Sequence, residues 1–193
     1  MHEVLIQYIR AHSATPLTEN ETEQIKSVFV PKKLRKRQYF LQAGEVCRSM
    51  AFIVKGAIRQ YSVDARGNEH ILRLCIEEWW AGDRESFTML TPSIYNIDAW
   101  EESDVLTITK TEMDGLSSIT SLNEMARTLD QNQSFAYQKR LNAAISYTAE
   151  KRYAELEQTY PEFLQRFPQH IIASYLGITK ETLSRIRNQA VKK

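Results

Sequence analysis

The chain has 193 residues, enough for one large or two small domains with a buried core. It carries 25 Lys and Arg against 24 Asp and Glu, so its overall charge favours no class of partner. Cys47 and Cys75 lie far apart without metal-binding spacing, and no apolar run reaches transmembrane length. We therefore expect a soluble, cytoplasmic protein with two reduced thiols, no signal peptide and no contact with a membrane.

Residues 1–29 have the spacing of helices. A first apolar stripe with intervals of three and four residues lies in residues 4–9, and Leu17-Thr18-Glu19 leads into a second helix that ends before Pro31. The basic run from Lys32 to Arg37 could be a localisation signal or a nucleic-acid patch. Because it continues into the apolar residues 39–41, we interpret it as the solvated side of an entering strand.

From residue 34 to residue 108 the pattern is typical of short strands. Runs rich in β-forming residues occur at 39–41, 50–54, 57–63, 70–76 and 104–109. Four of the six glycines separate these runs, and residues 64–68 form a predicted hairpin loop. Short strands at even spacing favour a jelly roll or barrel.

Residues 117–145 return to helical spacing. The stripe includes Leu122, Met125 and Leu129, and it becomes more polar towards residue 145. Such a helix could pack on its own domain as a linker, or it could pair with a second copy as a coiled dimer. A further helix is predicted from Ala149 to Tyr160, where Pro161 ends it.

Residues 169–188, QHIIASYLGITKETLSRIRN, have the spacing of a helix-turn-helix. Gly177 provides the backbone freedom of a sharp turn, and the hydroxyl of Thr179 can cap the second helix. Leu183 and Ile186 form the inward face of that helix.

The outward face of the second helix is polar. It carries groups that can bind base edges or phosphates: Thr179, Lys180, Glu181, Ser184, Arg185 and Asn188. From residue 180 onward the chain has five basic residues and one acidic residue, and Arg187, Lys192 and Lys193 are further candidates for phosphate contacts. A helical hairpin with a solvated outer face is the alternative, but the turn and the apolar register together favour DNA binding.

Residues 172–179, IASYLGIT, followed by Glu181-Thr182-Leu183-Ser184-Arg185, resemble the helix-turn-helix of the Crp/Fnr family of bacterial transcription regulators. The resemblance implies an α+β fold, with a cyclic-nucleotide-binding-like β-roll, a long dimerisation helix and a small helix-turn-helix domain. It assigns residues 1–116 to the sensor domain with its N-terminal helices, 117–145 to the dimerisation helix and 146–193 to the DNA-binding domain. The dimer seam would contain Leu122, Met125 and Leu129.

The resemblance also implies a ligand site in the β-roll. In that family a Gly-Glu pair and an Arg about ten residues later hold the ribose and the cyclic phosphate of the nucleotide. Here Gly82-Asp83 occupies the first position, and Ser93-Ile94 occupies the second without an Arg. A phosphate buried without a guanidinium loses a charge-assisted pair, so we expect a degenerate pocket that does not respond to cyclic AMP.

No cofactor is expected. Four thiolates for an iron–sulfur cluster are lacking, the four histidines are scattered, and no nucleophile–base pair indicates an enzyme. An unidentified small-molecule effector stays open. Trp79, Trp80, Tyr95 and Trp100 could line a different pocket, but we expect them to be core aromatics.

The expected partners are double-stranded DNA, a second copy of the chain and, by resemblance, RNA polymerase. The DNA target would be a palindrome with TGA-like half-sites. The alternative function is a ligand- or protein-sensing β-roll whose C-terminal helices contact protein rather than DNA. The connection 160–169 is too short for the β-hairpin that usually precedes the motif, and no wing follows the last helix. The DNA-binding domain should therefore be nearly all helical.

Overall fold

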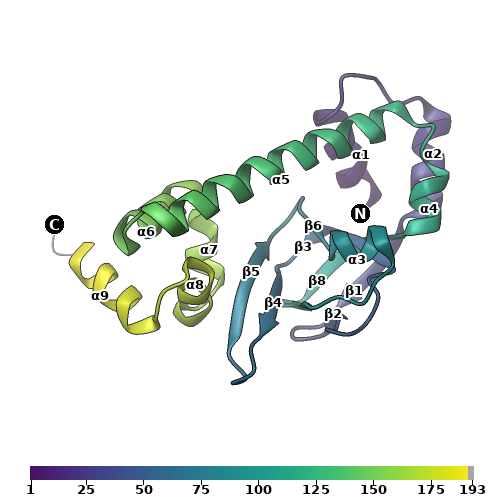
Figure 1. The fold of residues 1–193 in the computed structure, drawn as a ribbon. Coiled ribbons are helices and arrows are strands. Elements are labelled where there is room, and N and C mark those ends of the chain that lie inside the picture. Colours follow the sequence, from purple (N-terminus) through teal and green to yellow (C-terminus); the bar gives the residue numbers. More distant parts are fainter. Residues whose placement is uncertain (191–193) are drawn as a thin grey trace.

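The structure is a computed structural model that describes residues 1–190. Its helices are α1 (His2–Ala11), α2 (Glu19–Val28), α3 (Arg84–Met89), α4 (Lys110–Gly115), α5 (Thr120–Ser146), α6 (Ala149–Thr159), α7 (Pro161–Arg166), α8 (Gln169–Leu176) and α9 (Lys180–Ala190). Its strands are β1 (Val30–Leu34), β2 (Tyr39–Leu41), β3 (Ser49–Lys55), β4 (Ile58–Val63), β5 (Glu69–Cys75), β6 (Trp80–Ala81), β7 (Asn96–Ala99) and β8 (Ser103–Thr109). Figure 1 shows the α+β architecture: a β-roll, the long helix α5 and a helical C-terminal part.

Two antiparallel sheets form the β-roll. One has the strand order β1-β8-β3-β6 and the other β2-β7-β4-β5. Alternation along β3 separates two cores, since Ala51 and Ile53 point between the sheets while Phe52 points outward. The predicted β-roll and the hairpin between β4 and β5 are confirmed.

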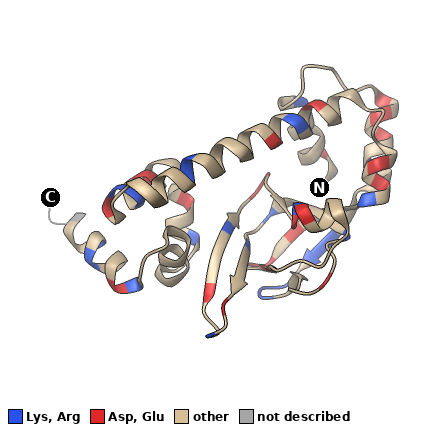
Figure 2. Ribbon diagram, in the orientation of Figure 1, with Lys and Arg blue, Asp and Glu red and all other residues tan. Residues whose placement is uncertain are grey.

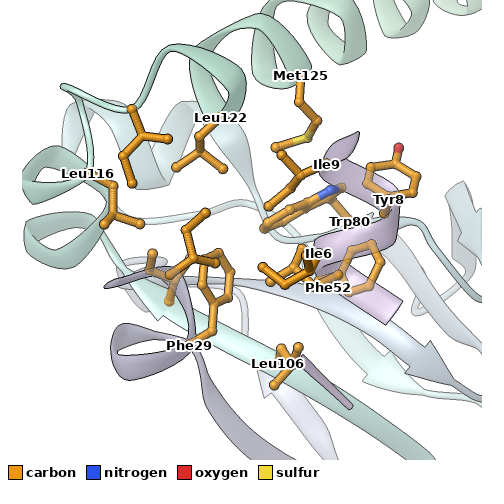
Figure 3. Close-up of a cluster of buried hydrophobic side chains, with 14 residues drawn as sticks. Ile6, Tyr8, Ile9, Phe29, Phe52, Trp80, Leu106, Leu116, Leu122 and Met125 are labelled. Carbon is orange, nitrogen blue, oxygen red and sulfur yellow. The ribbon is translucent and has the colours of Figure 1, made fainter. Parts of the chain in front are cut away.

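The outer face of the first sheet is covered by helices. Here Phe52 and Trp80 pack against Ile6 and Ile9 of α1 and against Met125 of α5 (Figure 3). Burial of each large apolar side chain of this kind stabilises the fold by about 1.5–3 kcal/mol. The N-terminal helices and the start of α5 therefore form one body with the β-roll.

The outer face of the second sheet is covered by the C-terminal helices. Ile71 and Leu74 of β5 share a buried cluster with Phe163, Ile172 and Leu183. The helical C-terminal part consequently packs on the second sheet of the β-roll and has its own apolar interior.

The sequence patterns did not predict several of the helices and strands. The helices α3, α4 and α7 and the strands β6 and β7 were not predicted, whereas the second helix ends at Val28, before Pro31, as predicted. Pro161 ends α6, as predicted, but it also occupies the first position of α7, where its fixed φ angle favours a new helix. In the described residues α7 fills the connection between α6 and α8, where no strand occurs.

Candidate nucleic-acid interface and sensor position

The turn between α8 and α9 has the predicted geometry. Gly177 has φ +66°, and the N–H of Ile178 donates to the carbonyl of Ala173 at 3.0 Å. A Cβ at Gly177 would meet only Arg152, at 3.7 Å, so the positive φ rather than crowding favours glycine. The hydroxyl of Thr179 accepts from the N–H of Thr182 at 3.2 Å, which confirms the predicted cap.

One face of α9 is anchored and the other is free. Leu183 and Ile186 are 1% and 4% exposed, and they pack in the cluster that includes Tyr153 and Leu156 of α6. Because residues three or four apart share a face of a helix, this anchoring fixes which side chains point outward.

The outward face carries the predicted base-reading residues. Lys180, Glu181, Arg185 and Asn188 are exposed, and Ser184 is half-buried. They line a shallow groove of about 550 Å³, to which two residues missed by the sequence analysis also contribute, namely Gln169 and Gln189. Their position, at the start of α8 and the end of α9, depends on how the helices cross. Thr179 lies beside this set at the cap.

The charged side chains of α9 lie at one end of the molecule. Figure 2 shows charged residues along α9, at the end of the molecule farthest from the N-terminal helices. Within residues 1–190, Arg185 forms no ion pair. The pKa of Glu150 on α6 is lowered, first by its own backbone N–H and by Thr148, and to a smaller extent by Arg185. Lys192 and Lys193, the other predicted phosphate contacts, lie outside the described residues.

The C-terminal helices are tied to the β-roll by polar contacts as well as apolar ones. Arg166 donates to Glu101 at 2.7 and 3.1 Å and to Glu77 at 2.5 and 3.1 Å. Burial would raise the pKa of Glu77, but the bonds from Arg166 and Gly56 outweigh that effect and lower it. The carbonyl of Arg166 also accepts from the indole N–H of Trp100 at 3.1 Å.

The edge strand β5 is covered by α8. The hydroxyl of Ser174 accepts from the N–H of Ile71 at 3.0 Å and donates to the carbonyl of Glu69 at 2.9 Å. Arg140 of α5 donates to the carbonyls of Leu72, Ile71 and Tyr175. These bonds satisfy backbone groups that an uncovered edge strand would leave open.

At the turn where the resemblance implies a ligand site, the polar side chains bond to the protein's own groups. Asp83 accepts from the N–H groups of Glu85 and Ser86, which caps α3, and from the hydroxyl of Ser93 at 2.6 Å. Asp83 and Ser93 are 7% and 3% exposed. A Cβ at Gly82 would lie 2.3 Å from Met50 Sδ, so this turn is closely packed.

The neighbouring residues point elsewhere. Ile94 is 70% exposed, and the guanidinium of Arg84 pairs with Asp130 on α5. No arginine therefore reaches the Asp83–Ser93 pair from the position where the resemblance requires one. Among the described residues, no group of three or more His, Cys, Asp or Glu side chains could hold a metal ion.

The expected dimer seam needs a correction. Leu122 and Met125 are each 2% exposed and belong to the core under α1, with Leu129 packed partly against it. These residues face the inside of their own chain, since the β-roll and α1 supply enough apolar surface to bury them. The exposed apolar residues of α5 come later in the helix: Phe135, Tyr137, Leu141 and Ile145.

The tryptophans that were expected in the core lie in two different environments. Trp80 is 7% exposed in the core, whereas Trp79 and Trp100 are half-buried at the contact with α7 and α8. Both Trp79 and Trp80 also line a second pocket, between α5 and the C-terminal helices.

Residues 31–118 match the cyclic nucleotide-binding domain family. The chain is 28% identical over 187 positions to the fumarate and nitrate reduction regulatory protein of Vibrio cholerae, an alignment that covers 88% of this chain and 72% of that protein. The protein of the same name from Escherichia coli K12 matches with the same identity and coverage.

Solved structures show the same fold. FixK2 from Bradyrhizobium japonicum superposes with a TM-score of 0.73 at 18% identity, over 86% of this chain and 85% of that one. A transcriptional regulator of the Crp/Fnr family from Eubacterium rectale gives a TM-score of 0.66 at 19% identity, over 91% and 85%. Among residues 1–190 no helix combines the length and the apolar character needed to cross a membrane. Residues 31–118 are thus a cyclic nucleotide-binding domain, the chain is homologous over most of its length to the fumarate and nitrate reduction regulatory proteins, and its fold matches that of a Crp/Fnr-family regulator.

Proposed function

We propose that this chain is a transcriptional regulator of the Crp/Fnr family, which binds a specific DNA palindrome as a dimer with α9 in the major groove. The outward face of α9 carries the proposal, because it brings Glu181 and Arg185 together, exposed and free of ion pairs among the described residues. Arg can donate two bonds to guanine, and Glu can accept from the amino group of cytosine. These two residues would read adjacent C and G positions of a TGA-like half-site.

The remaining polar residues of the site would fix the register of α9 on DNA. Thr179 and Lys180 lie at the start of the helix, where backbone N–H groups and a cation favour a phosphate. Ser184 and Asn188 would make weaker base or phosphate contacts. The small net charge of the chain, +1, agrees with a contact surface limited to this end of the molecule.

Dimerisation would place one α9 in each of two successive major grooves. We propose that the second copy packs on the outward face of α5, where Tyr137, Leu141 and Ile145 follow one another at intervals of four residues. This stripe lies on a different side of the helix from Leu122 and Met125. Of the three residues first expected in the seam, only Leu129 is partly accessible.

The sensor domain would not respond to cyclic AMP. Asp83 already accepts three hydrogen bonds, and Ser93 takes the place where the resemblance requires an arginine. We retain the proposed division into a sensor domain (1–116), a dimerisation helix (117–145) and a DNA-binding domain (146–193). The contacts of Arg166 and Ser174 join the first and last of these parts.

Selection from random duplex DNA tests this proposal directly. The full chain should enrich a palindrome with half-sites about one helical turn apart, and its affinity should fall steeply with salt because lysine and arginine displace counterions from phosphates. A protein that enriches no sequence, or binds DNA without salt dependence, would instead support C-terminal helices that contact another protein.

A further inference from the structure

A second pocket lies between α5, the sheet and the C-terminal helices. It has a volume of about 740 Å³, which is within the range of sites for small organic molecules. Its walls come from β5 and β6, from α5, and from α6 and α8. It is separate from the Asp83–Ser93 position, since neither residue lines it.

The charges in this pocket are unbalanced. Four cations line it, Arg73, Lys139, Arg140 and Arg152, against two carboxylates, Glu78 and Glu155. Within residues 1–190, none of these six forms an ion pair with a nitrogen–oxygen distance of 4.0 Å or less. A half-buried guanidinium without an anionic partner is costly, because desolvation is not compensated by a charge.

Two of the arginines keep free donors. The guanidinium of Arg73 donates to the carbonyl of Trp80 at 3.1 Å and has no other hydrogen-bond partner among the described residues. The guanidinium of Arg152 lines the pocket and forms no hydrogen bond within residues 1–190, and its buried Nε has no partner either. Arg140, in contrast, donates hydrogen bonds to three backbone carbonyls, and these bonds hold the wall of the pocket in place.

The remaining walls are aromatic. Trp79 and Tyr160 stand edge to face with centroids 5.5 Å apart, and Arg140 lies 4.0 Å from the ring centroid of Tyr175. Rings that are half-buried in a pocket offer flat apolar surface to a planar ligand. Guanidinium groups with free donors match the geometry of carboxylate and phosphate oxygens.

We propose that this pocket binds a flat organic anion, a ring system bearing a carboxylate or a phosphate, with Arg73 and Arg152 contacting the anionic group. Because β5 and α5 form one side and α6 and α8 the other, the ligand would bridge the sensor domain and the DNA-binding domain. Its binding would then be linked to how the two parts dock. The site does not depend on the proposed DNA sequence, and its test needs no DNA.

Calorimetry on the full chain can test the site with three probes of one ring size. These are 2-naphthoate, 2-naphthyl phosphate and the neutral 2-naphthalenemethanol. We expect at least one of the anions to bind about tenfold more tightly than the alcohol, the effect of one charge-assisted hydrogen bond. Equal affinities for all three, or no binding by either anion at millimolar concentration, would overturn the proposal.

Matched variants locate the binding. Arg152→Met should weaken the anion about tenfold without lowering the melting temperature, since its buried Nε has no partner to lose. Arg73→Gln should weaken it by a similar factor, although this variant also loses the bond to Trp80. Arg10→Gln, an exposed arginine on α1, is the control and should change nothing. Unaltered anion affinity in a folded Arg152→Met protein would contradict the site.

Discussion

The outward face of α9 and the turn at Asp83 are both predicted sites, but they differ in how their polar groups are satisfied. On α9, Glu181 and Arg185 are exposed, and Arg185 has no ion-pair partner in the described residues. At the sensor turn, Asp83 and Ser93 are buried and bond to each other. Polar groups that bind a partner must be accessible to water in the free protein, whereas groups that bond to each other inside the protein stabilise the fold instead.

The largest expected effect concerns whether two α9 helices act as a pair. Ile145→Glu should convert the dimer into monomers, since a charge would replace an apolar contact worth about 1.5–3 kcal/mol on each side of a two-fold axis. Ile145 is 78% exposed, so the fold itself should keep its melting temperature. Sedimentation of the wild type and the variant measures the change.

Asn132→Glu is the matched control, because this exposed position of α5 lies on another side of the helix. It should remain a dimer. A wild type that sediments as a monomer, or an Ile145→Glu protein that keeps the dimer mass, would place the assembly elsewhere.

The next effect tests the open face of α9. Arg185→Ala should cost about 1–3 kcal/mol per half-site and relax the preference at one guanine, because the bidentate bond to that base is lost. Binding to the selected palindrome and to single-base variants gives the measurement. Arg187→Ala, an exposed change on another side of the same helix, should weaken all sequences alike or none. An unchanged base preference in Arg185→Ala would show that this face does not read DNA.

A smaller effect is expected at the closed sensor turn. Asp83→Ala should lower the free energy of unfolding by about 1–3 kcal/mol, since it removes the cap of α3 and the partner of the Ser93 hydroxyl. Ser93→Ala removes only one of these bonds and should cost less. Urea denaturation compares the two variants.

Cyclic AMP provides the ligand side of the same comparison. At millimolar concentration it should leave the melting temperature and the DNA affinity of the wild type unchanged, because the acceptors of Asp83 are already used. Micromolar binding in a calorimeter would mean that the turn opens for the nucleotide.

The smallest effect concerns the ion pairs of Arg166, which join the C-terminal helices to the β-roll. The pKa of Glu77 is lowered in the folded protein, so this carboxylate contributes stability above its unfolded pKa of about 4.5, and the contribution is lost as the pH falls through the lower folded value. Both partners are partly exposed, so Arg166→Gln should cost about 1 kcal/mol near neutral pH. The difference from wild type should shrink below about pH 4.

Arg35→Gln serves as the control for this pH dependence. Arg35 is exposed and forms no ion pair within the described part of the chain, so its replacement should give a small difference that does not change with pH. Denaturant unfolding at several pH values separates the two variants. An Arg166→Gln difference that persists at pH 3 would argue against the pair with Glu77.

Local patterns were sufficient where a residue's role depends on near neighbours in the sequence. The turn at Gly177, the cap at Thr179 and the inward pair Leu183 and Ile186 follow from helix geometry and backbone conformation. The strands β3, β4, β5 and β8 follow from runs of β-forming residues between glycines. The outward face of α9 was predicted for the same reason, although its role on DNA stays a prediction.

Tertiary contacts decided the rest, because periodicity shows that a face is apolar but not what covers it. The stripe at Leu122 and Met125 suits a dimer seam equally well, yet α1 and the β-roll bury it within one chain. The bond between Asp83 and Ser93 joins residues ten positions apart across a turn, and the pocket of Arg73 and Arg152 combines a strand with a distant helix. The sequence by itself determined most of the elements and the polar outward face of α9, while packing between elements determined which polar groups were left without partners.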